Sequence, residues 1–314
     1  MRHVLAPIRV HEAAHGCVPG RSVRTAVAPH AGPPVVLRMD LECFFAGIGA
    51  GRVHGLLLGP AGLPEPVAYA VTSLVTTVVP ARLWRGVPVP AGTEERARHG
   101  RLGQHLTVPH LPQGAPTSPA LANLVCFRLD RRLAGLAASL GATYTRYVDD
   151  LTFSGDAAVG RDRSADLVIG IVDDEGFRVR AAKTSVTSAG RRQTVLGAVV
   201  NVRPTLPRPE RDALRALLHN CARHGWRSQT RGRDPVTFRD HVLAVLPGRP
   251  RSTRRSATDC TCWPTGWTGR RWRRANGSAA RPARRPSTPP RGSPAVGRAR
   301  SRRTGPGWPS ASRW

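Results

Sequence analysis

Two successive acidic residues, flanked by two runs typical of β-strands, set the tightest limit on what this chain can fold into. Residues 144–148 (YTRYV) and 151–153 (LTF) are rich in aromatic and β-branched side chains, and Asp149 and Asp150 separate them. Such runs around a short polar link predict a β-hairpin. The fold is therefore expected to contain an antiparallel pair of strands that presents two carboxylates at one end.

A third acid follows another short strand. Residues 35–39 are mostly apolar and lead into Asp40, so the sequence predicts a strand with an acid where it stops. Carboxylates that converge from separate strands suit Mg²⁺, which prefers oxygen ligands, and nucleotidyl transfer uses two such ions about 3.5–4 Å apart. Taken singly, an Asp at a strand end or an Asp–Asp pair is more typical of a solvated turn.

Helical periodicity and further strand-like runs account for most of the other residues before the C-terminal tail. Residues 66–79, 121–140 and 165–175, and a segment from Pro209 onward, are predicted to be helices because apolar side chains recur there at helical spacing. A pair of short strands is expected within 195–202. The predicted fold class is α+β, with a small antiparallel sheet backed by helices.

The balance of charge indicates a polyanionic partner. The chain has 48 basic and 20 acidic residues, a formal charge of +28, and cations in such excess neutralise phosphates. Residues 249–314 contribute 17 arginines and a single acid, Asp259. These residues show no helical or strand period and are predicted to be disordered. Out-of-frame translation of GC-rich DNA is the simpler explanation of this tail, and an arginine-rich RNA-binding arm is the alternative.

The cysteines and the apolar runs bear on the cellular compartment. The six cysteines are scattered, without the paired spacing of a zinc site or a disulfide framework. Neither a signal peptide nor a membrane-length apolar run is apparent in the sequence. We therefore expect a cytoplasmic protein that does not associate with a membrane.

Five segments in a fixed order carry a resemblance to a known family. They read LRMDLECFF at 37–45, LPQGAPTSPALANL at 111–124, YTRYVDDLTFSG at 144–155, GFRVRAAKT at 176–184 and LGAVVN at 196–201. Together they resemble the successive palm motifs of bacterial reverse transcriptases of the retron and group II intron lineage. The joint order makes this resemblance far more specific than the YVDD segment alone.

The resemblance implies the fold of a polymerase right hand. The expected parts are a partial fingers region at 1–34, a palm at 35–202 that includes helices connecting to the fingers, a partial helical thumb at 203–248 and the tail at 249–314. Only ten residues precede His11, where the family has a cationic fingers segment, and the tail begins where the thumb is expected to continue. The sequence thus resembles a truncated enzyme with a tail that is expected to be out of frame, so both an active and an inactive enzyme are compatible with it.

The resemblance also assigns roles to individual residues. Asp40, Asp149 and Asp150 are expected to be catalytic and to hold two Mg²⁺ ions, for which Mn²⁺ is a possible substitute. Leu41 and Phe45 are expected to contact the nucleotide, with Phe45 excluding a ribose 2′-hydroxyl; a phenylalanine of the core is the alternative for Phe45.

Further nucleotide contacts are expected from two other segments. Gln113 and Gly114 are assigned to the incoming nucleotide, although a Pro-Gly turn before a helix cap at Ser118 explains the same letters. Tyr147 is assigned to the nucleotide-binding surface at the primer end, with a structural aromatic of the sheet as the alternative.

Lys183 is the only lysine of the chain. A drift from lysine to arginine that spares one position indicates an amine that must exchange a proton, which guanidinium does poorly. In the resembling family the matching lysine is associated with protonation of the departing pyrophosphate, a general-acid role. A surface salt bridge is the alternative.

The nearest sub-family is indicated by the N-terminal residues. His11, His15 and the residues that follow resemble the segment before the first palm strand of retron enzymes. Ala26 and Val27 stand where those enzymes have Asn-Ala, and Leu196 departs from their Val-Thr-Gly motif. The sequence is therefore described as retron-like.

The function that these features predict is RNA-templated DNA synthesis from deoxynucleoside triphosphates (dNTPs). The expected partners are an RNA template, a DNA or RNA primer and dNTPs, and the retron resemblance adds a cognate non-coding RNA, an effector protein and a role in phage defence. A catalytically impaired remnant that only binds nucleic acid is the main alternative. An RNA-templated RNA polymerase is disfavoured by the bulk of Phe45.

Overall fold

The computed structural model describes residues 2–230, 234 and 238, all of which belong to a unit that spans residues 1–255. The predicted tail at 249–314 lies outside the described residues, as do residues 231–233, 235–237 and 239–248 of the predicted thumb. In chain order the elements are α1 (Arg2–Leu5), α2 (Val23–Val27), η1 (Ala28–His30), β1 (Val35–Asp40), α3 (Ala50–Leu58), α4 (Glu65–Val75), α5 (Ala81–Trp84), α6 (Thr93–Leu106), α7 (Ser118–Val125), α8 (Phe127–Ser139), β2 (Thr143–Tyr147), β3 (Asp150–Gly155), η2 (Ala157–Gly160), α9 (Asp162–Asp174), η3 (Ala181–Lys183), β4 (Ser185–Ser188), β5 (Thr194–Val195), β6 (Ala198–Val199), α10 (Arg208–His224) and η4 (Trp226–Gln229).

An antiparallel sheet of order β2-β3-β1-β4 forms the centre of the fold. Strand β1 pairs with β3 from Val35 opposite Gly155 to Asp40 opposite Asp150, and β2 pairs with β3 as a hairpin. The sheet and its helices confirm the predicted α+β class. Since β1 and β3 run in opposite directions, the last residue of one and the first residue of the other meet at the same end of the sheet.

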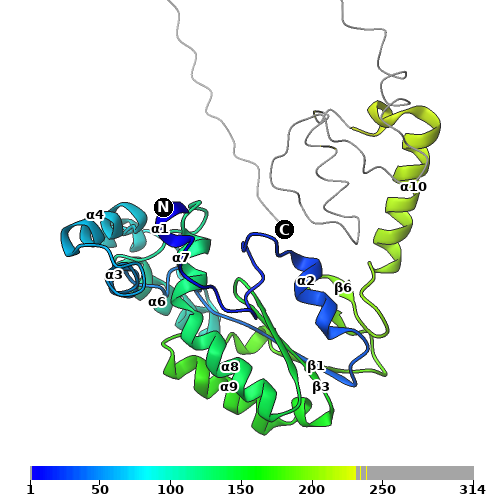
Figure 1. Ribbon diagram of the computed structural model, residues 1–314, viewed down its shortest axis with the longest axis horizontal. Helices are drawn as coiled ribbons and strands as arrows, with labels where there is room; N and C mark the ends of the chain where they lie inside the picture. Colours follow the sequence, from blue (N-terminus) through cyan, green and yellow to red (C-terminus); the bar gives the residue numbers. More distant parts are fainter. Residues whose placement is uncertain (1, 231–233, 235–237, 239–314) are drawn as a thin grey trace, which may run out of the picture. The chain divides into compact units, whose positions relative to one another are not determined.

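The two faces of the sheet pack against different layers (Figure 1). On one face, Leu37 and Met39 of β1 join the main core with apolar residues of α8 and α9. On the other, Val36 packs with Val27 of α2 and with Val195 of β5. This alternation follows from the period of two along a strand, which sends successive side chains to opposite faces.

Two of the predicted helices differ from the observed ones. The helix predicted at 121–140 is two helices, α7 and α8, because Cys126 between them has φ −79° and ψ 2°, outside helical geometry. The helix predicted at 66–79 ends earlier, at Val75. Thr77 is there hydrogen-bonded in both directions with His110, which draws the chain into extended backbone.

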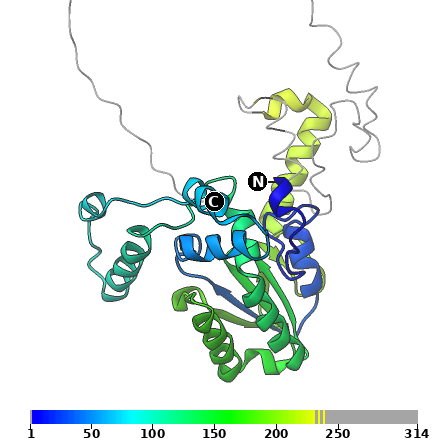
Figure 2. The same ribbon diagram turned by 60° about the vertical axis from the view of Figure 1, so that its left-hand side comes forward.

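Residues 77–110 form an arm that begins just after α4 and returns to its starting point. At its base, Thr77 pairs with His110, and the Val79 amide donates to the carbonyl of Leu106 (2.8 Å). The arm contains α5 and α6, drawn in teal at the left of Figure 2. The indole of Trp84 stacks on His99 with ring centroids 4.5 Å apart, which joins the two helices.

Among the described residues, no helix is both long and apolar enough to cross a bilayer.

Candidate active site

Asp40 and Asp150 meet at one end of the sheet, as the last register pair between β1 and β3. Asp149 lies in the turn just before β3, and its carbonyl accepts a 2.9 Å hydrogen bond from the Leu41 amide. The carbonyl of Asp40 itself accepts a hydrogen bond from the Arg180 amide (2.8 Å). The three acids singled out in the sequence are therefore placed on neighbouring segments by backbone pairing.

The environment of the hairpin acids disfavours their charged forms. Burial raises the pKa of the Asp149 carboxyl, and the Asp40 carboxylate raises it further. Burial also raises the pKa of Asp150, to which Asp149 and Asp40 add like-charge repulsion. A cluster of carboxylates that repel one another in a partly desolvated site is typical of a functional site rather than of a surface turn.

Lys183 contacts this cluster directly. Its Nζ donates to Asp40 Oδ2 at 2.7 Å, while its side chain remains 50% exposed. The lysine comes from η3, immediately before β4, and β4 pairs with β1. The only lysine in the sequence is thus brought to the acids by long-range strand pairing.

The remaining predicted residues next to the acids are the last residue of β2 and two residues that follow β1 in the chain. Tyr147 is the register partner of Asp150. Leu41 is buried, with 2% of its surface exposed, so only its backbone is available to a ligand. Phe45 is partly buried and packs edge-on against Phe44, with ring centroids 5.2 Å apart.

Gln113 and Gly114 lie in an exposed loop before α7. Gly114 has φ +90°, a backbone conformation that favours glycine. The Leu111 amide donates to the Ile48 carbonyl, which ties the start of the loop to the segment that follows Phe45. At the other end, the Ser118 hydroxyl donates to the carbonyl of Pro112 (2.7 Å). This loop is therefore anchored beside the segment that follows Phe45. The strand pairing between β1 and β3 joins the carboxylates and does not include Gln113 or Gly114.

A buried ion pair beneath the hairpin was not among the predicted site residues. Arg146 and Asp130 have fully buried side chains, and Arg146 Nε and Nη2 each donate to a different Asp130 oxygen at 2.7 Å. The Tyr144 hydroxyl also donates to Asp130 Oδ1 (2.9 Å). The sequence did contain an indication of this pair. Asp130 shares the apolar face of its helix with Leu133 and Ala137, and an acid buried on such a face requires a partner.

A second ion pair links the arm to the strand that carries Asp40. Arg101 of α6 donates to both carboxylate oxygens of Glu42, at 2.8 and 3.0 Å. Burial acts to raise the pKa of Glu42, but the hydrogen bond and the charge of Arg101 outweigh it, so the net pKa is lowered. This bidentate pair holds α6 beside the residue that lies two positions after Asp40.

Residues 13–16 run alongside the hairpin. The Arg146 amide donates to the Ala13 carbonyl (2.7 Å), and the His15 amide donates to the Arg146 carbonyl (2.8 Å). Further along, the ring of buried His30 lies between the hydroxyls of Ser154 (2.6 Å) and Thr145 (2.8 Å). Burial lowers the pKa of His30 to about 4, which keeps it neutral near pH 7. The N-terminal segment is thus part of the support of the hairpin.

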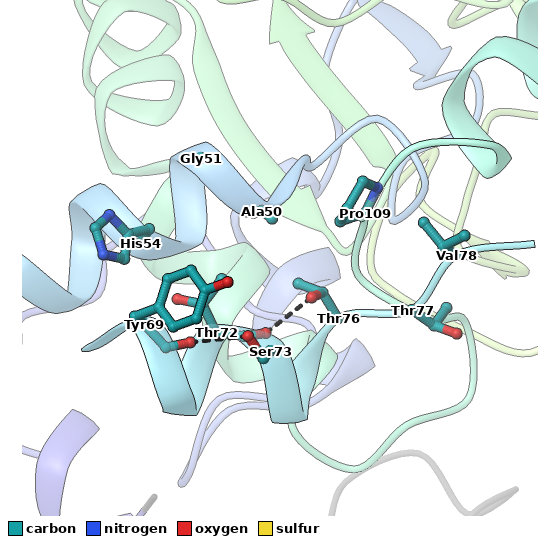
Figure 3. Close-up of a pocket in the computed structure, with 10 residues that line it drawn as sticks. All are labelled: Ala50, Gly51, His54, Tyr69, Thr72, Ser73, Thr76, Thr77, Val78 and Pro109. Carbon is teal, nitrogen blue, oxygen red and sulfur yellow. Dashed lines mark hydrogen bonds between the residues drawn. The ribbon is translucent and has the colours of Figure 1, made fainter. Parts of the chain in front are cut away.

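A cavity of about 500 Å³ opens between α3 and α4. Figure 3 shows its wall, in which the hydroxyls of Ser73 and Thr76 are bonded to carbonyls one helical turn earlier. His54 and Tyr69 also line it. None of its lining residues is an acid, a lysine or an arginine. It therefore does not coincide with the carboxylate cluster.

The donor set at the end of the sheet can be compared with the needs of a divalent cation. In the described part of the chain, no group of three or more His, Cys, Asp or Glu side chains is arranged as a metal site. The chemistry of Asp40, Asp149 and Asp150 nevertheless fits Mg²⁺: all are oxygen donors, and the raised pKa values of the last two reflect burial and repulsion that a cation would relieve. These residues fit the ion by charge and ligand type.

Sequence comparisons place this site in a known context. The family described as reverse transcriptase (RNA-dependent DNA polymerase) matches residues 66–212, which include the hairpin acids, Gln113 and Lys183 but not Asp40. Retron Mx65 reverse transcriptase of Myxococcus xanthus is 45% identical over 220 residues, 70% of this chain and 48% of its own length. Retron Mx162 reverse transcriptase of the same organism is 40% identical over 70% of this chain and 46% of its own.

A more distant relative also matches most of this chain but only part of its own length. Retron Ec86 reverse transcriptase of Escherichia coli is 28% identical over 70% of this chain and 59% of its own length. This chain therefore spans about half the length of the curated relatives it matches. The predicted resemblance to retron reverse transcriptases is confirmed by these matches.

Proposed function

Because the chain carries a domain of the reverse transcriptase family and is related to retron reverse transcriptases, we propose that it catalyses RNA-templated DNA synthesis from dNTPs. The observation that carries the proposal is the meeting of Asp40 and Asp150 across β1 and β3, with Asp149 in the adjoining turn. Reverse transcriptase domains generally use divalent metal ions such as Mg²⁺, and these carboxylates fit such ions.

The proposed reaction divides the work among the residues at this end of the sheet. Asp40, Asp149 and Asp150 hold the divalent ions, which when bound activate the primer hydroxyl and neutralise charge on the pyrophosphate. Lys183 donates a proton to the departing pyrophosphate, a role supported by its position 2.7 Å from Asp40. Tyr147 supports the primer end of the growing strand.

Selection of the nucleotide is assigned to the surface next to the acids. Phe45 blocks a ribose 2′-hydroxyl, while Gln113 and Gly114 contact the incoming nucleotide and Leu41 contributes its backbone. Template RNA and primer bind the basic surface of the chain. A cognate non-coding RNA is proposed from the retron relatives. An effector protein, a role in phage defence, the right-hand domain boundaries and the location in the cytoplasm remain predictions from the sequence.

Primer extension by the purified full chain tests the proposal. A DNA primer on an RNA template is extended with dNTPs and Mg²⁺, beside the Asp149→Ala/Asp150→Ala variant, and RNA binding is measured for both proteins. Extension by the wild type that the variant loses, with RNA binding retained, supports a reverse transcriptase. RNA binding without extension by either protein favours the impaired remnant.

Replacement of Phe45 by alanine is expected to relax sugar selection. Removing the ring leaves room for a 2′-hydroxyl, so the preference for dNTPs over ribonucleotides should fall by about tenfold to a hundredfold. The measurement is kcat/KM for each nucleotide type. Phe153→Leu is the matched control, because Phe153 is buried in β3 and stacks on Tyr144; it should lower stability without changing the ratio. An unchanged ratio in Phe45→Ala would rule out the steric role.

Two substitutions of Lys183 separate proton donation from charge. Lys183→Met should slow nucleotide addition by about 10² or more, as for loss of a general acid, and should tighten Mn²⁺ binding because no ammonium group competes for Asp40 Oδ2. Lys183→Arg keeps the charge but releases protons poorly. It should slow addition while leaving the Mn²⁺ affinity nearer that of the wild type. Full activity of Lys183→Arg would contradict the general-acid assignment.

A further inference from the structure

We propose that Arg146 is a positioning residue that fixes the turn carrying Asp149, and that its ion pair with Asp130 serves this purpose. The inference rests on the proposed function for its catalytic consequence. Its structural part, that the guanidinium holds the turn, stands on the contacts of the described residues alone.

The turn before Asp149 has an unfavourable backbone conformation. Val148 has φ +59°, in a region that a β-branched residue rarely adopts. Such a conformation costs about 1–3 kcal/mol and persists only where the surroundings enforce it. Some contact must therefore hold the backbone of Val148 in place. The same contact then fixes the position of Asp149, the next residue in the turn.

Arg146 supplies that contact through the third branch of its guanidinium. Nε and Nη2 are bound to Asp130, whereas Nη1 donates to the Val148 carbonyl at 2.9 Å. The group is planar and its donors are fixed relative to one another, so the position of Asp130 sets the position of Val148. A lysine has no such fork and cannot bind the carboxylate and the carbonyl in the same geometry.

Asp130 is in turn held in one place. Its Oδ1 accepts from the Tyr144 hydroxyl, and burial together with the Asp130 charge raises the pKa of Tyr144, so this hydroxyl stays protonated and donates. Asp130 lies on α8, part of the main core. A buried ion pair is seldom the most stable way to fill a core, and a role in fixing the turn is a reason to retain one.

The outer side of the turn is closed by the N-terminal segment. A Cβ on Gly16 would lie 2.6 Å from both the backbone nitrogen and Cγ2 of Val148, so only glycine fits there. The Asn123 side chain donates to the Gly16 carbonyl (2.8 Å) and secures this residue. Val148 is thus confined between Arg146 beneath it and Gly16 beside it.

The test compares two variants that each remove one bond from the same buried cluster. Arg146→Lys retains a charge for Asp130 but gives up the bond to the Val148 carbonyl. Tyr144→Phe removes a bond to Asp130 and leaves the Val148 bond intact, so it is the matched control. Both are made in the full chain, and melting temperature, hydrogen exchange and single-nucleotide addition are measured.

Hydrogen exchange at the Leu41 amide reports on the turn, because this amide is bonded to the Asp149 carbonyl. Exchange at the Arg180 amide, bonded to the Asp40 carbonyl, is the internal reference. Arg146→Lys should speed exchange at Leu41 about tenfold more than at Arg180, and kcat should fall by up to about a hundredfold with little change in the KM for dNTPs. Tyr144→Phe loosens Asp130 but keeps both Arg146–Asp130 bonds and the bond to the Val148 carbonyl, so it should change the exchange ratio and kcat far less than Arg146→Lys.

The outcomes are distinguishable from failure of the proposed function. If the wild type does not extend primers, the proposed function fails, but the exchange ratio still decides whether Arg146 holds the turn. If Arg146→Lys does not fold, the neutral pair Asp130→Asn with Arg146→Gln replaces it and is expected to show the same altered ratio. An unchanged ratio, or equal losses of kcat in Arg146→Lys and Tyr144→Phe, overturns the inference.

Discussion

The Asp150→Asn variant is expected to lose DNA synthesis and to melt at a higher temperature than the wild type. Nucleotide addition should fall by roughly 10³-fold or more, because Asp150 is one of the ligands proposed for the divalent ions. Stability should rise because burial and the charges of Asp149 and Asp40 raise the pKa of Asp150, so its ionised form destabilises the native state near pH 7. A gain of about 1 kcal/mol would raise the Tm by about 2–4 °C.

The pH dependence of this difference gives a second measurement. A carboxyl whose folded-state pKa is raised binds its proton more tightly in the native than in the unfolded state, so stability falls as the pH rises through the folded pKa. The Tm advantage of Asp150→Asn should therefore be present at pH 7 and shrink as the pH falls through the raised pKa of the wild-type carboxyl. The measurements are made without divalent metal, which would stabilise the wild type.

Asp156→Asn is the matched control for this variant. Asp156 follows the other end of β3 and is exposed, so its substitution should change neither the Tm nor nucleotide addition appreciably. A lower Tm for Asp150→Asn, or retained synthesis, would show that Asp150 is a structural residue of the hairpin.

Breaking the buried pair from one side is expected to produce the largest loss of stability in the chain. Asp130→Ala leaves the fully buried Arg146 guanidinium without its carboxylate, and loss of one partner of such a pair costs about 3–5 kcal/mol. The free energy of unfolding is measured by urea denaturation. The double variant Asp130→Leu/Arg146→Met removes both charges and should recover most of that loss.

The double variant also separates stability from function. If it regains stability but not nucleotide addition, the pair is retained for the turn and not for the fold. Recovery of both properties would show that the turn does not need the guanidinium, while a double variant as unstable as Asp130→Ala would show that the polar contacts themselves stabilise the core.

Local patterns in the sequence predicted much of this fold. The strand before Asp40 and the two strands around the hairpin acids are short, and their aromatic and β-branched residues carry a strong local signal. The amphipathic helix α9 is likewise close to its predicted range. Features that depend on distant residues were missed. Helix α4 ends at Val75 because the following residues pair with the chain at 110, and periodicity does not report such a pairing.

The same distinction applies to the candidate site. The three acids and Lys183 were chosen from their motifs, and strand pairing brings Asp40, Asp150 and Lys183 together. The contact between Arg146 and Asp130 joins a strand to a helix, and no local period connects them. The sequence alone does not identify Asp130 as the partner of Arg146, so it gives no reason to distinguish Arg146 from other charged residues in strands.

The pairing of residues 13–16 with β2 also limits how far the edge of the sheet can pair with strands of other molecules. An uncovered edge strand offers free amides and carbonyls to any second strand, which is a common route to aggregation. Here the β2 edge is occupied at Arg146 by Ala13 and His15, and the opposite edge strand, β4, is only four residues long. The N-terminal segment thus protects the central sheet from edge-to-edge association, and a shortened protein lacking it would be prone to self-association through the strand that leads to Asp149.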